Sequence, residues 1–229
     1  MTLTQQRPVD DPPVGHRRRP LVVLLVAVLA LGLLVLGGAG AVVLGMGADS
    51  SGAAATPTDD SVDAGFSRDM AIHHLQGVEM ADLATGRSTD PQVLLLASDI
   101  SATQTNQVGR MQGWLALWGL NVTGGTRMSW LDGGHDMHMS ADGLMPGMAT
   151  EDELTNLRSL SGTAFDVEFL RLMIRHHEGG SEMAQYAAEH ADQSVVRSLA
   201  RSIYEAQTAE TTTMTDMLTA RGGTPLPPP

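Results

Sequence analysis

The sequence MAIHHLQGVEMA at Met70–Ala81 recurs in altered form as MIRHHEGGSEMA at Met173–Ala184. Both stretches fit the pattern M-x-x-H-H-x-x-G-x-E-M-A, with an offset of 103 residues between them. An alignment without gaps at that offset matches about 20 of 57 positions, so the chain contains an internal duplication. The repeats cover 63–119 and 166–222, and an insert over 120–162 separates them.

The spacing around each histidine pair predicts a helix, because apolar and histidine positions recur at alternating steps of four and three residues. These stripes are Phe66, Met70, His73, Gly77, Met80 and Ala84, and then Phe169, Met173, His176, Gly180, Met183 and Ala187. We expect helix pairs over 63–85 and 90–119 and over 164–190 and 192–222, with a short helix over 151–160. The predicted fold is all-α, a four-helix bundle built from a tandem duplicated helical hairpin.

Folding each helix pair about its turn places a glutamine level with each central histidine. Gln104 then lies beside His73, and Gln207 occupies the equivalent position beside His176, while Met70, Met80, Met173 and Met183 lie above and below this layer. His74 and His177 are expected at the edge of the buried stripe. Gly77 and Gly180 each cost about 1 kcal/mol in a helix relative to Ala, so we expect close helix approach or room beside the imidazoles.

Two interpretations of the histidine layer remain open from the sequence. Buried imidazoles need partners for both ring nitrogens, and a His–Gln layer that fixes the helix register would provide them. Alternatively, the duplicated histidines with nearby thioethers would bind a metal ion.

The insert adds a second group of candidate ligands. It contains Met128, His135, Met137, His138, Met139, Met145 and Met148. One interpretation is a methionine-rich lid over the apolar surface of the bundle. The other is capture of a soft metal, because thioether and imidazole ligands together suit copper as Cu(I) or Cu(II). Zinc fits less well, since its sites favour Cys, His and carboxylate ligands.

Several other functions are not expected. The chain has no cysteine, which excludes thiolate zinc sites and iron–sulfur clusters, and we expect no haem or nucleotide cofactor. It lacks the Glu-x-x-His motifs of di-iron bundles and any phosphate-loop or dinucleotide fingerprint. A net charge of −12 without a basic stripe in the folded region argues against nucleic-acid binding.

The N-terminal region predicts a single-pass membrane anchor. Arg17–Arg19 precede an apolar run over 20–44, which is long enough to span a bilayer and leaves residues 1–19 cytoplasmic. A cleaved signal peptide is the alternative and would make the protein secreted. Residues 45–61 read as a flexible linker, 62–222 as the extracytoplasmic bundle, and 223–229 as a proline-rich tail.

The chain resembles the bacterial family catalogued as domain of unknown function 305 over about residues 62–222. The resemblance rests on the two F-x-x-x-M-x-x-H-H-x-x-G-x-E-M-A segments, the downstream I-x-x-x-Q, and the M-x-G-M at Met145–Met148. It implies a ferritin-like four-helix bundle that is secreted or membrane-anchored, and some relatives are periplasmic copper-binding proteins. The implied ligands are Met70, His73, His74, Met80, Met173, His176, His177 and Met183, with the insert residues as further candidates.

The sequence therefore favours a non-enzymatic, membrane-anchored copper protein that buffers, sequesters or transfers the ion, with a copper-handling protein as a possible partner. A structural or interaction module, whose His–Gln layer only specifies packing, is the alternative. A copper-dependent redox enzyme ranks third, because no substrate pocket can be recognised in the sequence.

Overall fold

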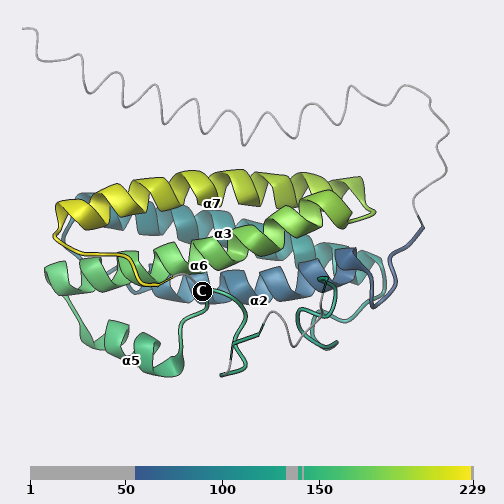
Figure 1. Ribbon diagram of the computed structural model, residues 1–229, viewed down its shortest axis with the longest axis horizontal. Coiled ribbons are helices and arrows are strands. Elements are labelled where there is room, and N and C mark those ends of the chain that lie inside the picture. Colours follow the sequence, from purple (N-terminus) through teal and green to yellow (C-terminus); the bar gives the residue numbers. More distant parts are fainter. Residues whose placement is uncertain (1–54, 133–138, 141, 228–229) are drawn as a thin grey trace, which may run out of the picture. The chain divides into compact units, whose positions relative to one another are not determined.

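The computed structural model describes residues 55–132, 139–140 and 142–227. These residues form only helices, with no strand among them: α2 (Val62–Asp82), α3 (Pro91–Leu117), α5 (Glu151–Ser159), α6 (Gly162–His190) and α7 (Ser194–Ala220) (Figure 1). The expected anchor over 20–44 lies outside the described residues. None of the helices in the described part is long and apolar enough to cross a membrane.

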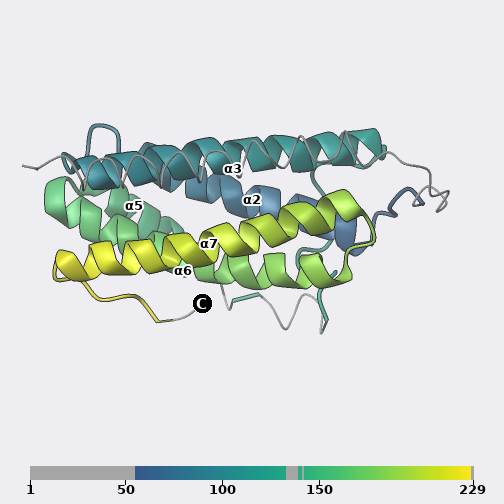
Figure 2. The ribbon, with the colours of Figure 1, turned by 90° about the horizontal axis from the view of Figure 1, so that it is seen from above.

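The four long helices form a bundle of two hairpins, as the duplication predicts. Helix α2 packs on α3 within the first repeat, α6 packs on α7 within the second, and α2 and α6 join the repeats. Figures 1 and 2 show these helices running side by side, with the short helix α5 outside the bundle next to α6. The all-helical bundle is therefore confirmed.

The predicted helix boundaries follow from local hydrogen bonds. Asp90 caps the start of helix α3, because its side chain accepts from Gln92 N, and Pro91 occupies the first helical position. Gly119 and Gly222 end α3 and α7 with φ angles of 71° and 74°. Leu120 N donates to Leu115 O at one end, and the second repeat has the equivalent bond, so both helices close with a Schellman motif.

The buried core consists of two apolar clusters, one at each end of the bundle. Met70 of α2 and Met183 of α6 belong to one cluster, whereas Met80 and Met173 belong to the other. Along α2 the histidine layer lies between Met70 and Met80, and along α6 it lies between Met173 and Met183. The prediction of methionines above and below the layer is therefore confirmed.

The described part of the insert packs against the bundle. Met128 and Met145 are buried, and Met139 and Met148 are partly buried against the cluster that contains Met70. This packing is what the lid interpretation expects of these methionines, and metal ligation by Met139, Met145 and Met148 stays a prediction. His135, Met137 and His138 lie outside the described residues.

A buried carboxylate on α2 holds the insert at Met128 and Trp130. Asp69 accepts from the Met128 backbone N–H (2.7 Å) and from the Trp130 indole N–H (2.8 Å). Trp130 packs edge-on against Phe66, and its side chain fills the space that a side chain on Gly65 would need. Met128 and Trp130 of the insert are therefore part of the core.

Candidate metal centre

Four histidines from two helices meet in the middle of the bundle. His73 and His74 on α2 and His176 and His177 on α6 are all 0% exposed, and the His73 and His176 rings lie 3.9 Å apart between centroids. The central position of His73 and His176 was predicted. His74 and His177, expected at the edge of the stripe, are instead fully buried, because α3 and α7 supply side chains that contact them.

Every one of the four imidazoles uses its Nε2 atom in one hydrogen bond with an oxygen. His73 Nε2 pairs with Pro146 O (3.0 Å), and His176 Nε2 pairs with His73 O (2.9 Å). His74 Nε2 pairs with Gln107 Oε1 (2.7 Å), and His177 Nε2 pairs with Glu210 Oε2 (2.8 Å).

These partners fix the tautomer of each ring. Carbonyl, amide and carboxylate oxygens accept hydrogen bonds, so each Nε2 carries the proton and donates it. In a neutral imidazole the other nitrogen then holds a lone pair. All four Nδ1 atoms are buried without a hydrogen-bond partner among the described residues, as are Gln104 Oε1 and both side-chain polar atoms of Gln207.

Burial keeps His73, His74 and His176 neutral. Burial, with a smaller contribution from the positive charge that neighbouring imidazoles would carry, lowers the pKa of His73 to about 4 and that of His74 to about 3. Burial also holds the pKa of His176 well below its usual value. At neutral pH these rings therefore present lone pairs rather than charges, which is the state that binds metal ions.

The two mid-helix glycines have the packing role that their sequence positions suggested. A Cβ atom on Gly77 would overlap the Gln104 side-chain oxygen and lie 2.9 Å from His176 Cε1. On Gly180 it would lie 2.7 Å from Gln207 Oε1 and 3.1 Å from His73 Cε1. Each glycine thus makes room for a glutamine and for the central imidazole of the other repeat.

A segment at the end of the insert, residues 145–150, lies against the central histidines, and we name it the strap. It contains the Met145–Met148 motif, and its Pro146 carbonyl accepts from His73. Gly147 packs against the backbone of Arg175 and His176, and Gly179 leaves space for the Pro146 carbonyl. Sequence reasoning identified the motif but not this contact.

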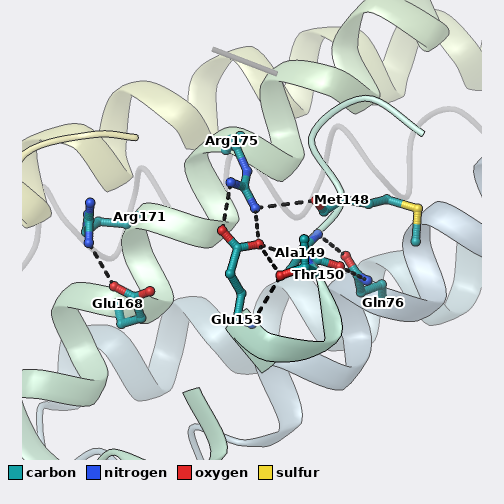
Figure 3. Close-up of polar contacts among 8 residues, drawn as sticks. All are labelled: Gln76, Met148, Ala149, Thr150, Glu153, Glu168, Arg171 and Arg175. Carbon is teal, nitrogen blue, oxygen red and sulfur yellow. Dashed lines mark hydrogen bonds and ion pairs between the residues drawn. The ribbon is translucent and has the colours of Figure 1, made fainter. Parts of the chain in front are cut away.

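Side chains of α2, α5 and α6 hold the strap in place (Figure 3). Gln76 both donates to and accepts from the Ala149 backbone, at 2.9 and 2.7 Å. Thr150 and Glu153 form the predicted capping box of α5. Glu153 also forms an ion pair with Arg175 at 2.6 Å, which ties the start of α5 to α6.

Two residues in contact with the histidines were missed by sequence reasoning. Gln107 and Glu210 occupy equivalent positions at the offset of 103, each three residues beyond the glutamine of the predicted layer. That spacing places them on the same helix face as Gln104 and Gln207. The repeat alignment places them at matching positions, but the two residues differ, so sequence identity between the repeats gives no signal there.

The donor set limits which metal site can form here. Within the described residues no three His, Asp or Glu side chains are placed to hold a metal ion together. Met70 and Met183 in one flanking cluster, and Met80 and Met173 in the other, stay predicted sulfur ligands of a soft-metal site. The orphaned Nδ1 atoms fit such a soft-metal site.

Comparison with known proteins identifies related sequences and structures. The family model described as Domain of unknown function (DUF305) matches residues 63–218. No curated protein gave a significant match. A crystal structure from Streptomyces coelicolor, whose description proposes a secreted DUF305 protein, is 40% identical with a TM-score of 0.68, and the match covers 74% of this chain and 99% of that one.

Two further solved structures share the fold. A DUF305 fragment from Deinococcus radiodurans is 31% identical with a TM-score of 0.58, over 71% of this chain and 97% of that one. CopM in its Cu(II)-bound form is 25% identical with a TM-score of 0.55, over 70% of this chain and 97% of that one.

Proposed function

This chain belongs to the DUF305 family, and from that premise and the histidine layer we propose that it binds copper outside the cytoplasm. The protein would sequester, buffer or transfer the ion without catalysing a reaction. The apolar run over 20–44 would anchor it in the membrane, or would direct its secretion if it is cleaved. A copper-handling protein would receive or supply the ion.

The observation that carries this proposal is the set of four orphaned Nδ1 atoms in one buried layer. Each ring is oriented by a hydrogen bond from Nε2 to an oxygen, which is the arrangement that typically surrounds a metal-bound histidine. Leaving a buried acceptor unpaired costs about 1–3 kcal/mol, so a layer that served only for packing would carry this penalty several times. A metal ion would satisfy these lone pairs.

Copper is favoured over other metals by the chemistry around the histidines. Thioether sulfur is a soft ligand that suits Cu(I), and imidazole accepts either copper oxidation state. The Cu(II)-bound structure of CopM, at 25% identity, supports copper as the ion, and the description of the Streptomyces coelicolor relative supports a location outside the cytoplasm.

A Cu(I) competition titration of the full chain in detergent tests the proposal. We expect copper to be held against a chelating competitor by the wild type and to be lost by a variant with His73, His74, His176 and His177 changed to Ala. Circular dichroism must show that the variant remains helical. A His135→Ala, His138→Ala variant serves as the control, and copper binding that depends on these two residues alone would place the site in the insert.

A wild-type chain that binds neither Cu(I) nor Cu(II) at micromolar concentration would contradict the proposal. The histidine layer would then be a packing device, as the alternative interpretation from the sequence holds.

A further inference from the structure

The two repeats are not equivalent at the outer histidines. His74 donates to the neutral amide oxygen of Gln107, whereas His177 donates to the carboxylate of Glu210. The two distances, 2.7 and 2.8 Å, are nearly the same, and residues 107 and 210 occupy matching positions in the repeats. The two hydrogen bonds thus differ in the charge of the acceptor but hardly in distance.

Glu210 also lines a small cavity in the seam between α3 and α7. The cavity has a volume of about 10 Å³, close to what a single water molecule needs. Matching positions of the two repeats line it: Ile100, Thr103, Gln104 and Gln107 from α3, and Ile203, Ala206, Gln207 and Glu210 from α7. Glu210 is the one ionisable side chain in this lining. Its side chain is 30% exposed, so it contacts solvent as well as the buried His177.

A cation is costly in such a layer unless a negative charge lies close by. Its neighbours there are imidazole rings, amides and thioethers, which supply dipoles but no negative charge. A carboxylate on the far nitrogen of a ligating histidine both orients the ring and raises its basicity, and losing such a partner typically costs 10–100-fold in metal affinity.

We propose that Glu210 makes the two histidine pairs unequal, so that the first copper ion binds at the His176–His177 half of the layer. This inference rests on the proposed function. Glu210 is a positioning residue that acts through His177, and Gln107 leaves the His73–His74 half as the weaker one. The duplicated motif would therefore provide one strong half-site rather than two identical sites.

Exchanging the two side chains tests the inference directly. In Cu(I) competition titrations of the full chain, Glu210→Gln should weaken binding of the first ion by about 10–100-fold. Adding Gln107→Glu to that variant should restore the affinity, because the seam is nearly symmetric and accepts a carboxylate on either side. In the wild type, His177→Ala should weaken copper binding more than His74→Ala does. In the Glu210→Gln, Gln107→Glu double variant, His74→Ala should weaken it more.

Glu178→Gln provides the matched control. It removes the same charge from the residue next to His177 but leaves the Glu210 hydrogen bond in place, so its affinity should stay within about twofold of the wild type. Thermal melts of the metal-free variants must show an unchanged fold. These substitutions are nearly isosteric, and Gln and Glu each already occupy one of the two positions.

The outcomes separate this inference from the proposed function. If the wild type binds copper and Glu210→Gln changes the affinity by less than about twofold, the unequal halves are refuted and the copper function stands. Equal losses of copper affinity in Glu210→Gln and Glu178→Gln would also refute it, because the loss of any nearby negative charge would then explain the effect. A wild type that binds no copper overturns both.

Discussion

Burial and one hydrogen bond set the chemistry of each imidazole in the layer. His176 shows this clearly, because its ring is fully buried and its Nε2–H bonds to the His73 carbonyl. The remaining nitrogen has a lone pair and no partner in the described chain. Such a residue costs stability in the metal-free protein, and under the proposed function it would contribute binding energy when an ion is present.

Replacing His176 with Leu should therefore stabilise the metal-free protein. The change removes a buried acceptor without a partner, which destabilises the folded state by about 1–3 kcal/mol. The carbonyl that loses its donor, His73 O, lies inside α2, where the helix itself provides a donor. We expect urea denaturation to show a free energy of unfolding raised by about 1–2 kcal/mol, and we expect copper to protect the variant less than the wild type.

His73→Leu is the comparison, because it also releases the Pro146 carbonyl of the strap, and its gain should be smaller. A large loss of stability in His176→Leu, with no effect of copper on either protein, would instead support the packing interpretation.

The lowered pKa values predict how the stability of the metal-free protein depends on pH. The pKa of His73 is about 4 when folded against 6.5 as the unperturbed value, so between these values the unfolded chain binds a proton that the folded chain excludes. The free energy of unfolding should fall as the pH drops from about 6.5 to 4, by on the order of 3 kcal/mol for His73 alone. Above pH 6.5 this contribution is fully present.

Urea denaturation at pH 7 and pH 4.5 measures this effect, with His73→Leu as the control that lacks the titrating group. If the free energy of unfolding falls by the same amount between the two pH values in both proteins, His73 is not held neutral by burial.

At the scale of the helices, the close approach of α2 to α3 depends on the absence of a side chain at Gly77. A Cβ atom on Gly77 would overlap Gln104 and crowd His176. Because both neighbours are buried and packed, Gly77→Ala should destabilise the protein by about 1–3 kcal/mol despite the better helix propensity of Ala.

Gly109→Ala is the matched control within α3. Gly109 is exposed, and nothing lies within 4 Å of a Cβ atom placed there, so this change should stabilise the helix by up to about 1 kcal/mol. Thermal melts of the two variants compare them directly. A gain in melting temperature from Gly77→Ala would contradict the close approach.

The elements of this fold could largely be predicted from the sequence, whereas their long-range contacts could not. Periodicity and the duplication gave the four long helices, and Thr150 with Glu153 gave the start of α5, because these signals are local. The bond between Pro146 and His73 joins residues 73 positions apart and depends on how an irregular loop folds back. The full burial of His74 and His177 likewise depends on side chains that α3 and α7 supply.

Across the whole bundle, the duplication gives an approximate symmetry that the single insert breaks. His176 Nε2 bonds to the carbonyl of His73, but His73 Nε2 bonds to the strap instead of to the carbonyl of His176. Because the insert is present once, only one side of the layer is covered in this way. The symmetry gives four similar lone pairs, and the insert and Glu210 make their surroundings different.

Histidine NMR shows whether the buried Nδ1 atoms bind Cu(I), because Cu(I) is diamagnetic and the full chain contains only 8 histidines to assign. In a chain labelled with ¹⁵N at histidine, we expect Cu(I) to shift Nδ1 resonances of the buried histidines while their Nε2 atoms keep their protons. Shifts confined to His135 and His138, or loss of the Nε2 protons of the buried rings, would rule out copper binding through the buried Nδ1 atoms.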